Sequence, residues 1–379
     1  MKKSGLFFVF SILFFNLYSQ TDSSHLRISL ITCSPGAELY STFGHSAVRV
    51  TDSAVFTDKV YNYGTFEFDD DFYMNFVKGR LLYYLSVENY RDFVAFYQEE
   101  GRSISEQVLD LTDAEKLRLQ KALITNAAYQ NRYYKYQFLF DNCATRIRDI
   151  VKSNTDEQVT FKKILPADDI TFRKMIHSYL HKTGNDWSGV GIDILLGMSL
   201  DRKVKNEEAM FLPDFLAKGF DSAYNGSRKL VSSVHTVYTA PEPAGQGSAL
   251  FSPFGVFTIV FVVYMLISFW SRKAGVILDS ILFFVTGLLG VLLVFMWTGT
   301  DHADCKNNFN LLWAFPPHLI AAFFVAGKKK RISKYWWYTA LLQIILLLLW
   351  FFLPQQLNNG LIPVVALLAC RSWVLSRRT

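Results

Sequence analysis

Two residues of this 379-residue sequence are placed for nucleophilic chemistry: Cys143 and His45. Cys143 follows the pair Asp141-Asn142, an N-cap signal, and begins a stretch with helical periodicity. A thiol in the first turn of a helix meets the positive end of the macrodipole and backbone amides without partners. These lower its pKa and supply donors for an oxyanion. Cys143 is therefore a candidate nucleophile.

A thiol nucleophile needs a base, and His45 is the best candidate among the histidines. It follows Phe43-Gly44 and begins an alternating segment, 45–51, which predicts a strand that fixes the direction of the ring. If this strand pairs with residues 59–64 as a hairpin, Asn62 falls near His45. Asn62 is then the candidate third residue that orients the imidazole.

The elements that must position these residues follow from local pattern. Strands are expected at 26–32, 45–51, 60–63 and 81–87. Thr112 and Glu115 form a capping box that predicts a helix start. In the helix that begins at Cys143, residues Ile147, Ile150 and Val151 share its face, so we expect the thiol to point toward the core.

Other readings of these residues stay open on pattern alone. Cys143 is also consistent with a small buried core residue, or with a disulfide to Cys33 in an oxidising compartment. His177 and His181 have the i,i+4 spacing of metal ligands, but no third ligand is placed to complete a site. The four cysteines are far apart and form no CxxC pair, which excludes a zinc knot.

Composition places part of the chain in lipid. The sequence is 51% hydrophobic and only 19% charged. Lys2-Lys3 followed by the apolar run 6–17 predicts a signal peptide over 1–20. Five apolar segments lie at 254–270, 276–297, 311–326, 336–353 and 361–375, of which the first, second and fourth are long enough to span a bilayer. Pro316-Pro317 and Arg371 interrupt the other two.

The loops between these segments predict the orientation. Arg272-Lys273, the basic run 328–331 and Arg377-Arg378 alternate with the loops 298–310 and 354–360, which carry few basic residues. By the positive-inside rule the basic loops are cytoplasmic. We therefore expect an exported domain at 21–230, a linker at 231–253 and a polytopic region at 254–379. The net charge of +6 arises in that region, which has 11 basic and 3 acidic residues from 251 onward, so it gives no reason to expect nucleic-acid binding.

Four motifs in the exported domain carry a resemblance to a known family. They are the segments 30–36 (LITCSPG), 40–49 (YSTFGHSAVR), 60–66 (VYNYGTF) and 140–146 (FDNCATR). Together they resemble the Lnb N-terminal periplasmic domain family of Bacteroidota, over most of residues 26–220. The leader and the polytopic C-terminal region are similar to those of full-length Lnb lipoprotein N-acyltransferases.

The resemblance implies an α+β, circularly permuted papain-like domain in the periplasm, followed by about five transmembrane helices in the bacterial inner membrane. It implies Cys143 as nucleophile and His45 as general base and acid; Asn62 as the third member is our extrapolation. The expected reaction moves an acyl chain from a membrane phospholipid, through a thioester, to the N-terminal amine of a diacylglyceryl lipoprotein, without cofactor or metal. A cell-wall peptidase or amidase, a phospholipase, and a non-catalytic assembly module are the alternatives.

The outer loop 298–310 adds one expectation. It contains His302 within the polar run 301–304, between two predicted spans and on the side of the exported domain. Loops fixed at both ends by helices are well placed to form a substrate entrance. We therefore expect His302 to contact a phospholipid headgroup or to position the acceptor amine.

Overall fold

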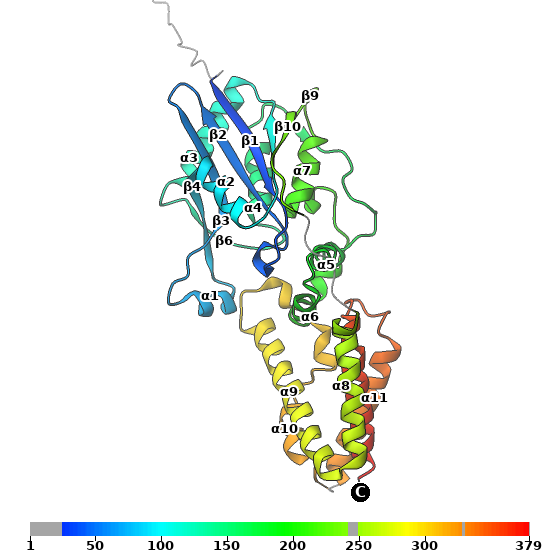
Figure 1. Cartoon of the computed structure of the whole chain (residues 1–379). Coiled ribbons are helices and arrows are strands. Elements are labelled where there is room, and N and C mark those ends of the chain that lie inside the picture. Colours follow the sequence, from blue (N-terminus) through cyan, green and yellow to red (C-terminus); the bar gives the residue numbers. More distant parts are fainter. Residues whose placement is uncertain (1–24, 242–248, 328–329, 379) are drawn as a thin grey trace, which may run out of the picture.

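The computed structural model describes residues 25–241, 249–327 and 330–378, and shows a sheet domain that continues into a helical region (Figure 1). The expected α+β domain followed by membrane helices is confirmed. The predicted signal peptide, 1–20, lies outside the described residues.

The exported domain is built on a seven-stranded antiparallel sheet. Its strand order is β10-β5-β1-β2-β3-β4-β6. The strands are β1 (Leu26–Cys33), β2 (His45–Asp52), β3 (Thr57–Thr65), β4 (Leu82–Asn89), β5 (Ile104–Leu109), β6 (Tyr133–Lys135) and β10 (Val231–Tyr238). All four strands expected from the sequence form, within two or three residues of the predicted ends.

Both faces of the sheet are covered, and seven of the eight residues of β1 are buried. Leu26, Ile28 and Leu30 point into a core that also contains residues of α3, α4 and α7. Ile31 and Cys33 point to the opposite face, where Phe93 of α2 covers them. A strand buried on both faces needs apolar residues at consecutive positions rather than alternate ones.

The seven α-helices of this domain lie between its strands in the chain. They are α1 (Phe72–Lys78), α2 (Tyr90–Glu99), α3 (Asp113–Ala127), α4 (Cys143–Lys152), α5 (Phe172–Lys182), α6 (Asp186–Leu195) and α7 (Pro213–Asp221). A second, three-stranded sheet consists of β7 (Val159–Thr160), β8 (Tyr224–Asn225) and β9 (Arg228–Lys229). The capping box predicted at Thr112 and Glu115 is present, with Thr112 Oγ1 accepting from the Glu115 amide at 3.2 Å.

The predicted linker at 231–253 is wrong in its first third. Residues Val231–Tyr238 form β10, which pairs antiparallel with β5 at the edge of the sheet. An edge strand can carry polar side chains such as Ser232 and His235, because one of its sides is open to solvent. That polar character made the segment look like a connection.

The C-terminal region is helical. It contains α8 (Pro253–Trp270), α9 (Arg272–Thr298), α10 (His318–Ala321), α11 (Lys330–Leu348) and α12 (Ile362–Ser376). Among the described residues, three helical stretches are long and apolar enough to cross a membrane: α8, α9 and Asn359–Ser376.

The structure agrees with one expectation about single spans and corrects another. As the prolines indicated, the segment 311–326 is not one continuous helix: it is a 3-10 turn, the short α10 and a second 3-10 turn around Pro316-Pro317. Proline lacks a backbone donor and clashes with the preceding turn, so it interrupts the helix. The fifth segment, rather than the fourth, meets the length and hydropathy of a span, since α11 begins with Lys330, Arg331 and Lys334.

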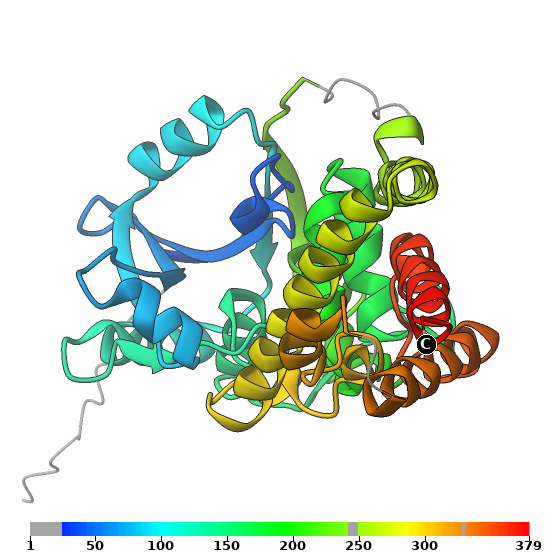
Figure 2. The same cartoon turned by 90° about the horizontal axis from the view of Figure 1, so that it is seen from below.

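Among the described residues, the helical region meets the sheet domain at one end. The Trp187 indole donates to the Phe251 carbonyl at 3.0 Å, and Asn358 Nδ2 donates to Asp193 at 2.7 Å. At the other end, Ser333 donates to the Ser376 carbonyl and the chain terminates (Figure 1). The loops predicted to be periplasmic therefore lie at the end that contacts the exported domain. Seen from below, the bundle lies beneath α5 and α6, and the large sheet extends to one side (Figure 2).

Candidate active site

The structure brings Cys143, His45 and Asn62 together at one end of the large sheet. His45 is the first residue of β2, Cys143 is the first residue of α4, and Asn62 lies on β3. The Cys143 side chain is hydrogen-bonded to His45. His45 Nε2 lies 2.6 Å from Asn62 Oδ1. Because Nε2 is engaged by Asn62, it is Nδ1 of the ring that is left for the thiol.

The hairpin between β2 and β3 sets this geometry. Val48 pairs with Tyr61, and continuing that register toward the start of β2 puts Ala47 opposite Asn62. Residues 45 and 47 share one face of the strand, so His45 and Asn62 lie on the same face of the sheet. The sequence-based placement of Asn62 near His45 agrees with the structure.

The N-cap of α4 fixes the position of Cys143. Asn142 Oδ1 accepts from the Thr145 amide at 2.9 Å, and Thr145 Oγ1 accepts from the Asn142 amide at 2.8 Å. Asn142 Nδ2 also donates to the carbonyls of Phe138 and Phe211 at 2.7 and 2.8 Å. One asparagine thus caps the helix and ties its first turn to two other segments, which leaves Cys143 little freedom to move.

Two glycines allow the approach of the reacting elements. Gly44 has a φ of +79°, and a Cβ there would lie 2.8 Å from the Cys33 carbonyl oxygen. Gly64 has a φ of +95° and lies at a register shift of β3, where a Cβ would face Cys143 at 3.7 Å and His45 at 4.0 Å. A side chain at either position would be strained and would fill space that the site uses.

The thiol and the imidazole change each other's pKa. Burial is the largest influence on both groups; it raises the pKa of Cys143 and lowers that of His45. The attraction of opposite charges and the hydrogen bond between the two groups outweigh burial, so the pKa of Cys143 falls below its ordinary value and that of His45 rises above it. The backbone amides of Ser46 and Ala144, which hydrogen-bond to the sulfur, lower the thiol pKa further. This is the electrostatic environment of a thiolate paired with an imidazolium.

A chain of hydrogen bonds holds Asn62. Its Nδ2 donates to Glu88 Oε1 at 2.9 Å, and Ser86 Oγ donates to the same oxygen at 2.7 Å. The amide nitrogen of Asn62 is committed to Glu88, so its oxygen faces His45. Glu88 and Ser86 lie on β4, and Ser86 is the residue opposite Asn62 in the register.

The Cys143 and His45 side chains line a cavity of about 690 Å³. Much of its wall is aromatic: Phe43, Phe66, Phe76, Tyr83, Phe96, Tyr97, Tyr136, Phe138 and Phe211. A second cavity, of about 340 Å³, adjoins it and shares Phe76, Tyr83, Tyr136 and Phe138 as a common wall. Leu81, Ile176 and Leu196 line this second cavity, and residues 301–304 of the loop after α9 close it on the membrane side. The second cavity therefore lies between the catalytic cavity and the helical region.

Comparison with known protein families shows which family this chain is similar to. Residues 14–176 match the family model of the Lnb N-terminal periplasmic domain, and residues 245–379 match that of the Lnb transmembrane domain. The chain belongs to the Lnb family. It is a membrane protein with a periplasmic domain, and it carries both parts of the family in the order expected. No curated protein and no solved structure matches it.

The other sequence candidates of this Lnb protein take part in different contacts. All four cysteines are free, so the alternative disulfide between Cys33 and Cys143 is absent. His177 lies 2.7 Å from Asp193, and His181 lies 3.1 Å from Asp186, so both are paired with carboxylates. Among the described residues, no cluster of three His, Cys, Asp or Glu residues is arranged to hold a metal.

His302 lies away from the thiol but lines the second cavity. Its Nε2 is 2.9 Å from the carbonyl oxygen of Phe76 on α1. The neighbouring Asp301 pairs with Lys135 at 2.9 Å and with Arg80 at 3.2 Å, both in the periplasmic domain. The loop thus holds α1 and the end of β6 against the helical region, and a role of His302 in substrate binding stays a prediction.

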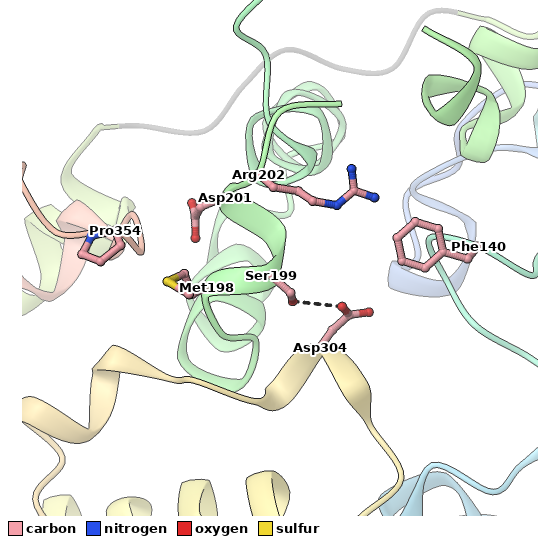
Figure 3. Close-up of a pocket in the computed structure, with 7 residues that line it drawn as sticks. All are labelled: Phe140, Met198, Ser199, Asp201, Arg202, Asp304 and Pro354. Carbon is pink, nitrogen blue, oxygen red and sulfur yellow. Dashed lines mark hydrogen bonds between the residues drawn. The ribbon is translucent and has the colours of Figure 1, made fainter. Parts of the chain in front are cut away.

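A further cavity lies at the junction between the periplasmic domain and the helical region. It measures about 400 Å³ and is lined by Phe140, Met198, Ser199, Asp201, Arg202, Asp304 and Pro354 (Figure 3). Ser199 donates to Asp304 at 2.9 Å, and Arg202 extends toward the ring of Phe140 (Figure 3). These contacts join the periplasmic domain to the loops of the helical region, so we assign the cavity to the junction and not to the reaction.

Sequence reasoning missed Glu88, Ser86, Tyr97 and Arg102. The ring of Tyr97 stacks on His45 with centroids 6.2 Å apart, and Arg102 lines the same cavity as Cys143. These residues lie on β4, on α2 and in the turn before β5, and only the register of the sheet brings them to the site. No local motif marks them.

Proposed function

We propose that this Lnb-family protein is a thiol-dependent acyltransferase that moves a fatty acyl chain from a membrane phospholipid to the N-terminal amine of a lipoprotein. The observation that carries the proposal is the Cys143–His45–Asn62 arrangement in an aromatic cavity that extends toward the membrane end of the domain. A thiolate paired with an imidazolium is suited to covalent acyl transfer. An aromatic and aliphatic lining is suited to a hydrocarbon chain.

The first half-reaction forms a thioester. The Cys143 thiolate attacks the ester carbonyl of the phospholipid, and the amides of the first turn of α4 stabilise the oxyanion. The imidazolium of His45 gives its proton to the departing glycerol oxygen. The carbon–oxygen bond breaks, a lysophospholipid leaves, and the acyl chain stays on the sulfur.

The second half-reaction forms an amide. The α-amine of the diacylglyceryl-modified cysteine of a lipoprotein attacks the thioester, and His45 accepts the proton that the amine loses. The carbon–sulfur bond breaks and the thiolate–imidazolium pair is restored. Because an amide is more stable than a thioester, this step needs no other source of energy.

The location of the site supports substrates that stay in the bilayer. Both the donor and the acceptor are lipid-anchored, and a thiol attached to membrane helices meets them at a high effective concentration. A soluble peptide substrate would have no use for the aromatic residues that line both cavities. The lining and the membrane helices favour acyl transfer over a cell-wall peptidase or amidase, for which Cys143 and His45 are equally necessary.

The decisive experiment is mass spectrometry of lipoprotein N-termini from cells with the gene, without it, and with the Cys143→Ala or Cys33→Ala variant. We expect the N-acyl mass to disappear without the gene and with Cys143→Ala, and to be present with Cys33→Ala. The matched cysteine control separates loss of the nucleophile from loss of a buried thiol. An unchanged N-terminal mass in the deletion strain would refute acyl transfer to lipoproteins, and free fatty acid released by the purified protein would instead indicate a phospholipase.

A further inference from the structure

Arg102 is a buried cation in the wall of the catalytic cavity. It lies in the turn between α2 and β5, its residue exposure is only 4%, and it lines the same cavity as Cys143 and His45. It does not line the second cavity. Arginine is almost never buried unless its charge is compensated, so its partners decide what it does.

The partners within the protein leave part of the guanidinium unused. Arg102 Nε donates to the Ser34 carbonyl at 2.8 Å, and the guanidinium carbon lies 4.6 Å from the centre of the Tyr97 ring. The nearest carboxylate oxygen, from Glu100, is 3.8 Å from Nη1. Nη2 is buried and has no hydrogen-bond partner among the described residues.

The Arg102 guanidinium is therefore fixed in direction, but no carboxylate is hydrogen-bonded to it. The contacts with Ser34 and Tyr97 fix its direction, but neither neutralises its charge. The Glu100 carboxylate is beyond hydrogen-bond distance and also accepts from the Tyr40 hydroxyl at 3.3 Å. A fixed guanidinium with free donors is the usual receptor for an oxyanion with two or more oxygens, above all a phosphate.

We propose that Arg102 binds the phosphate of the donor phospholipid and thereby selects a phosphate-bearing donor. The assignment rests on the proposed function, because it places the donor in the same cavity. In a phospholipid the ester carbonyls lie between the phosphate and the hydrocarbon tails. With the phosphate at Arg102 and the carbonyl at Cys143, the tail extends along the wall shared by the two cavities, past Phe76 and Tyr136.

The order of groups in the cavity supports this orientation. The Arg102 guanidinium lies over the ring of Tyr97, and this ring stacks on His45, so the cation, the tyrosine and the catalytic imidazole are consecutive neighbours. The aromatic residues shared with the second cavity do not include these groups. The phosphate end and the tail end of the donor thus have separate places, with the thiol and imidazole lining the space between them.

The test compares two donors that differ only in the phosphate. The full-length protein in mixed micelles receives either a diacyl phospholipid or a neutral diacylglycerol with the same acyl chains. The rate of acyl-enzyme formation at Cys143 is measured by mass spectrometry as a function of donor concentration. The variants are Arg102→Gln and Arg102→Lys, with Arg91→Gln on the exposed surface of α2 as the matched control.

We expect the wild type to prefer the phospholipid, and Arg102→Gln to lose about tenfold or more of its rate on the phospholipid at low donor concentration, which is the size expected for lost charge-assisted hydrogen bonds. Its rate on diacylglycerol should stay within about twofold of wild type, which also shows that the variant folds. Arg102→Lys, which keeps the charge but not the fork of donors, should lie between them, and Arg91→Gln should match wild type.

Three outcomes overturn the assignment. Equal losses of rate on both donors would show that Arg102 supports the fold or the imidazole and does not bind the phosphate of the donor. No loss on either donor would show that it binds no part of the donor. Protection of Cys143 from iodoacetamide by inorganic phosphate, lost in Arg102→Gln but without any donor preference, would assign the site to free phosphate. If no donor acylates Cys143 in the wild type, the proposed function itself fails, and that result is distinct from all three.

Discussion

At the scale of single residues, the thiol gains its reactivity from a neighbour and not from its own position alone. Burial by itself raises a thiol pKa, as it does for Cys33, which lies beside the site in the sheet core. Cys143 is also buried, but the charge of His45 and the hydrogen bond to it lower its pKa. The two cysteines therefore form an internal comparison, since one has an imidazole partner and the other does not.

This contrast predicts the pH dependence of alkylation. The thiolate–imidazolium pair exists between the lowered pKa of Cys143 and the raised pKa of His45, so iodoacetamide should modify Cys143 at a pH below the ordinary thiol value of 9.0. In His45→Ala only burial and the two backbone amides remain, and the midpoint should move to higher pH. Peptide mapping of the alkylated protein measures both profiles. Cys33→Ala should leave the profile unchanged; a shift there would mean that Cys33 is the modified thiol.

Asn62 and Glu88 predict a smaller effect with a distinct signature. The hydrogen bond that Asn62 Oδ1 accepts from the imidazole raises the pKa of His45, so Asn62→Ala should move the alkaline limb of the acyl-enzyme pH profile to lower pH. Loss of a general base costs about 10²–10⁴-fold, and loss of the group that orients it should cost less than His45→Ala. Glu88→Gln should produce a weaker form of the same shift, because it disturbs only the partner of Asn62. An unshifted limb in Asn62→Ala would show that the hydrogen bond does not act on the imidazole.

Cys143, His45 and Asn62 could be identified from the sequence because each has a local signal. Cys143 follows an N-cap residue, and His45 follows a glycine at the start of a strand. Asn62 lies on the strand that pairs with the strand of His45 in a hairpin. Arg102 and Glu88 carry none. They are separated from Cys143 by tens of residues and meet the site through the strand order, which places β4 next to β3 and β5 next to β1. Pairing between distant strands is not encoded in any short window, so these residues could be found only in three dimensions.

At the scale of elements, the same distinction separates the helices from the edge strand. The starts of α3 and α4 follow from their capping residues: the capping box predicted at Thr112 forms, and Asn142 caps α4 as predicted, with Thr145 completing a second box. Strand β10 was missed because only part of it is buried, so it carries polar residues like those of a connection. The break in the third membrane segment was visible in the sequence, because a helix cannot continue through Pro316-Pro317.

The capping glutamate of α3 predicts how this element responds to acid. Glu115 is fully buried and accepts hydrogen bonds from the Thr112 and Asp156 amides, Asn225 and Arg228. Burial raises its pKa, but these donors outweigh burial and lower the pKa to about 2. A folded-state pKa below the unfolded value stabilises the protein above the unfolded pKa, and the stabilisation is lost as the pH falls toward 2.

Glu115→Gln should therefore destabilise the periplasmic domain by an amount on the order of 3 kcal/mol at neutral pH. Urea unfolding of the full-length protein, followed at pH 7 and at pH 3, measures the difference from wild type. We expect the difference to be large at pH 7 and smaller at pH 3. Asp113→Asn, in the same first turn but more than half exposed, is the control and should have little effect at either pH. A difference that does not change with pH would assign the loss to packing and not to the charge.

At the scale of the whole molecule, α6 joins the periplasmic domain to the helical region. Val190 packs in the same apolar core as Trp350 and Leu357 of the helical region, and Asn310 donates to the Asp193 carbonyl at 2.7 Å. Gly197 crosses the outer loop so closely that a Cβ would lie against the Lys306 carbonyl. These contacts hold the two cavities in a fixed relation to the outer end of the helices.

This arrangement predicts the topology of the loops. A phosphatase fusion at Gly245, in the linker outside the described residues, should be active because the enzyme folds only in the periplasm. A fusion after Arg378 should be inactive, since that end lies with the basic loops at the opposite end of the bundle from the sheet domain. The pair of fusions is its own control for expression. Activity at both sites would require an even number of spans.

The junction also predicts what happens when the helices are removed. The cores around the sheet and around α5 and α7 lie entirely within residues 26–238, so the fragment 21–241 should fold. It should form the Cys143 acyl-enzyme from a soluble short-chain ester at a rate close to that of the full chain, because the thiol, imidazole and amide are all present. Transfer to a lipoprotein embedded in a bilayer should fall about 10²-fold or more, since the fragment no longer shares the membrane with its substrates.

Val190 would be uncovered in the fragment, so the fragment should be compared with the full chain in the same detergent. The fragment with Cys143→Ala gives the background of both measurements. Full-length rates of transfer by the fragment would show that the membrane helices are dispensable, and loss of acyl-enzyme formation from the soluble ester would show that the junction is needed to shape the catalytic cavity itself.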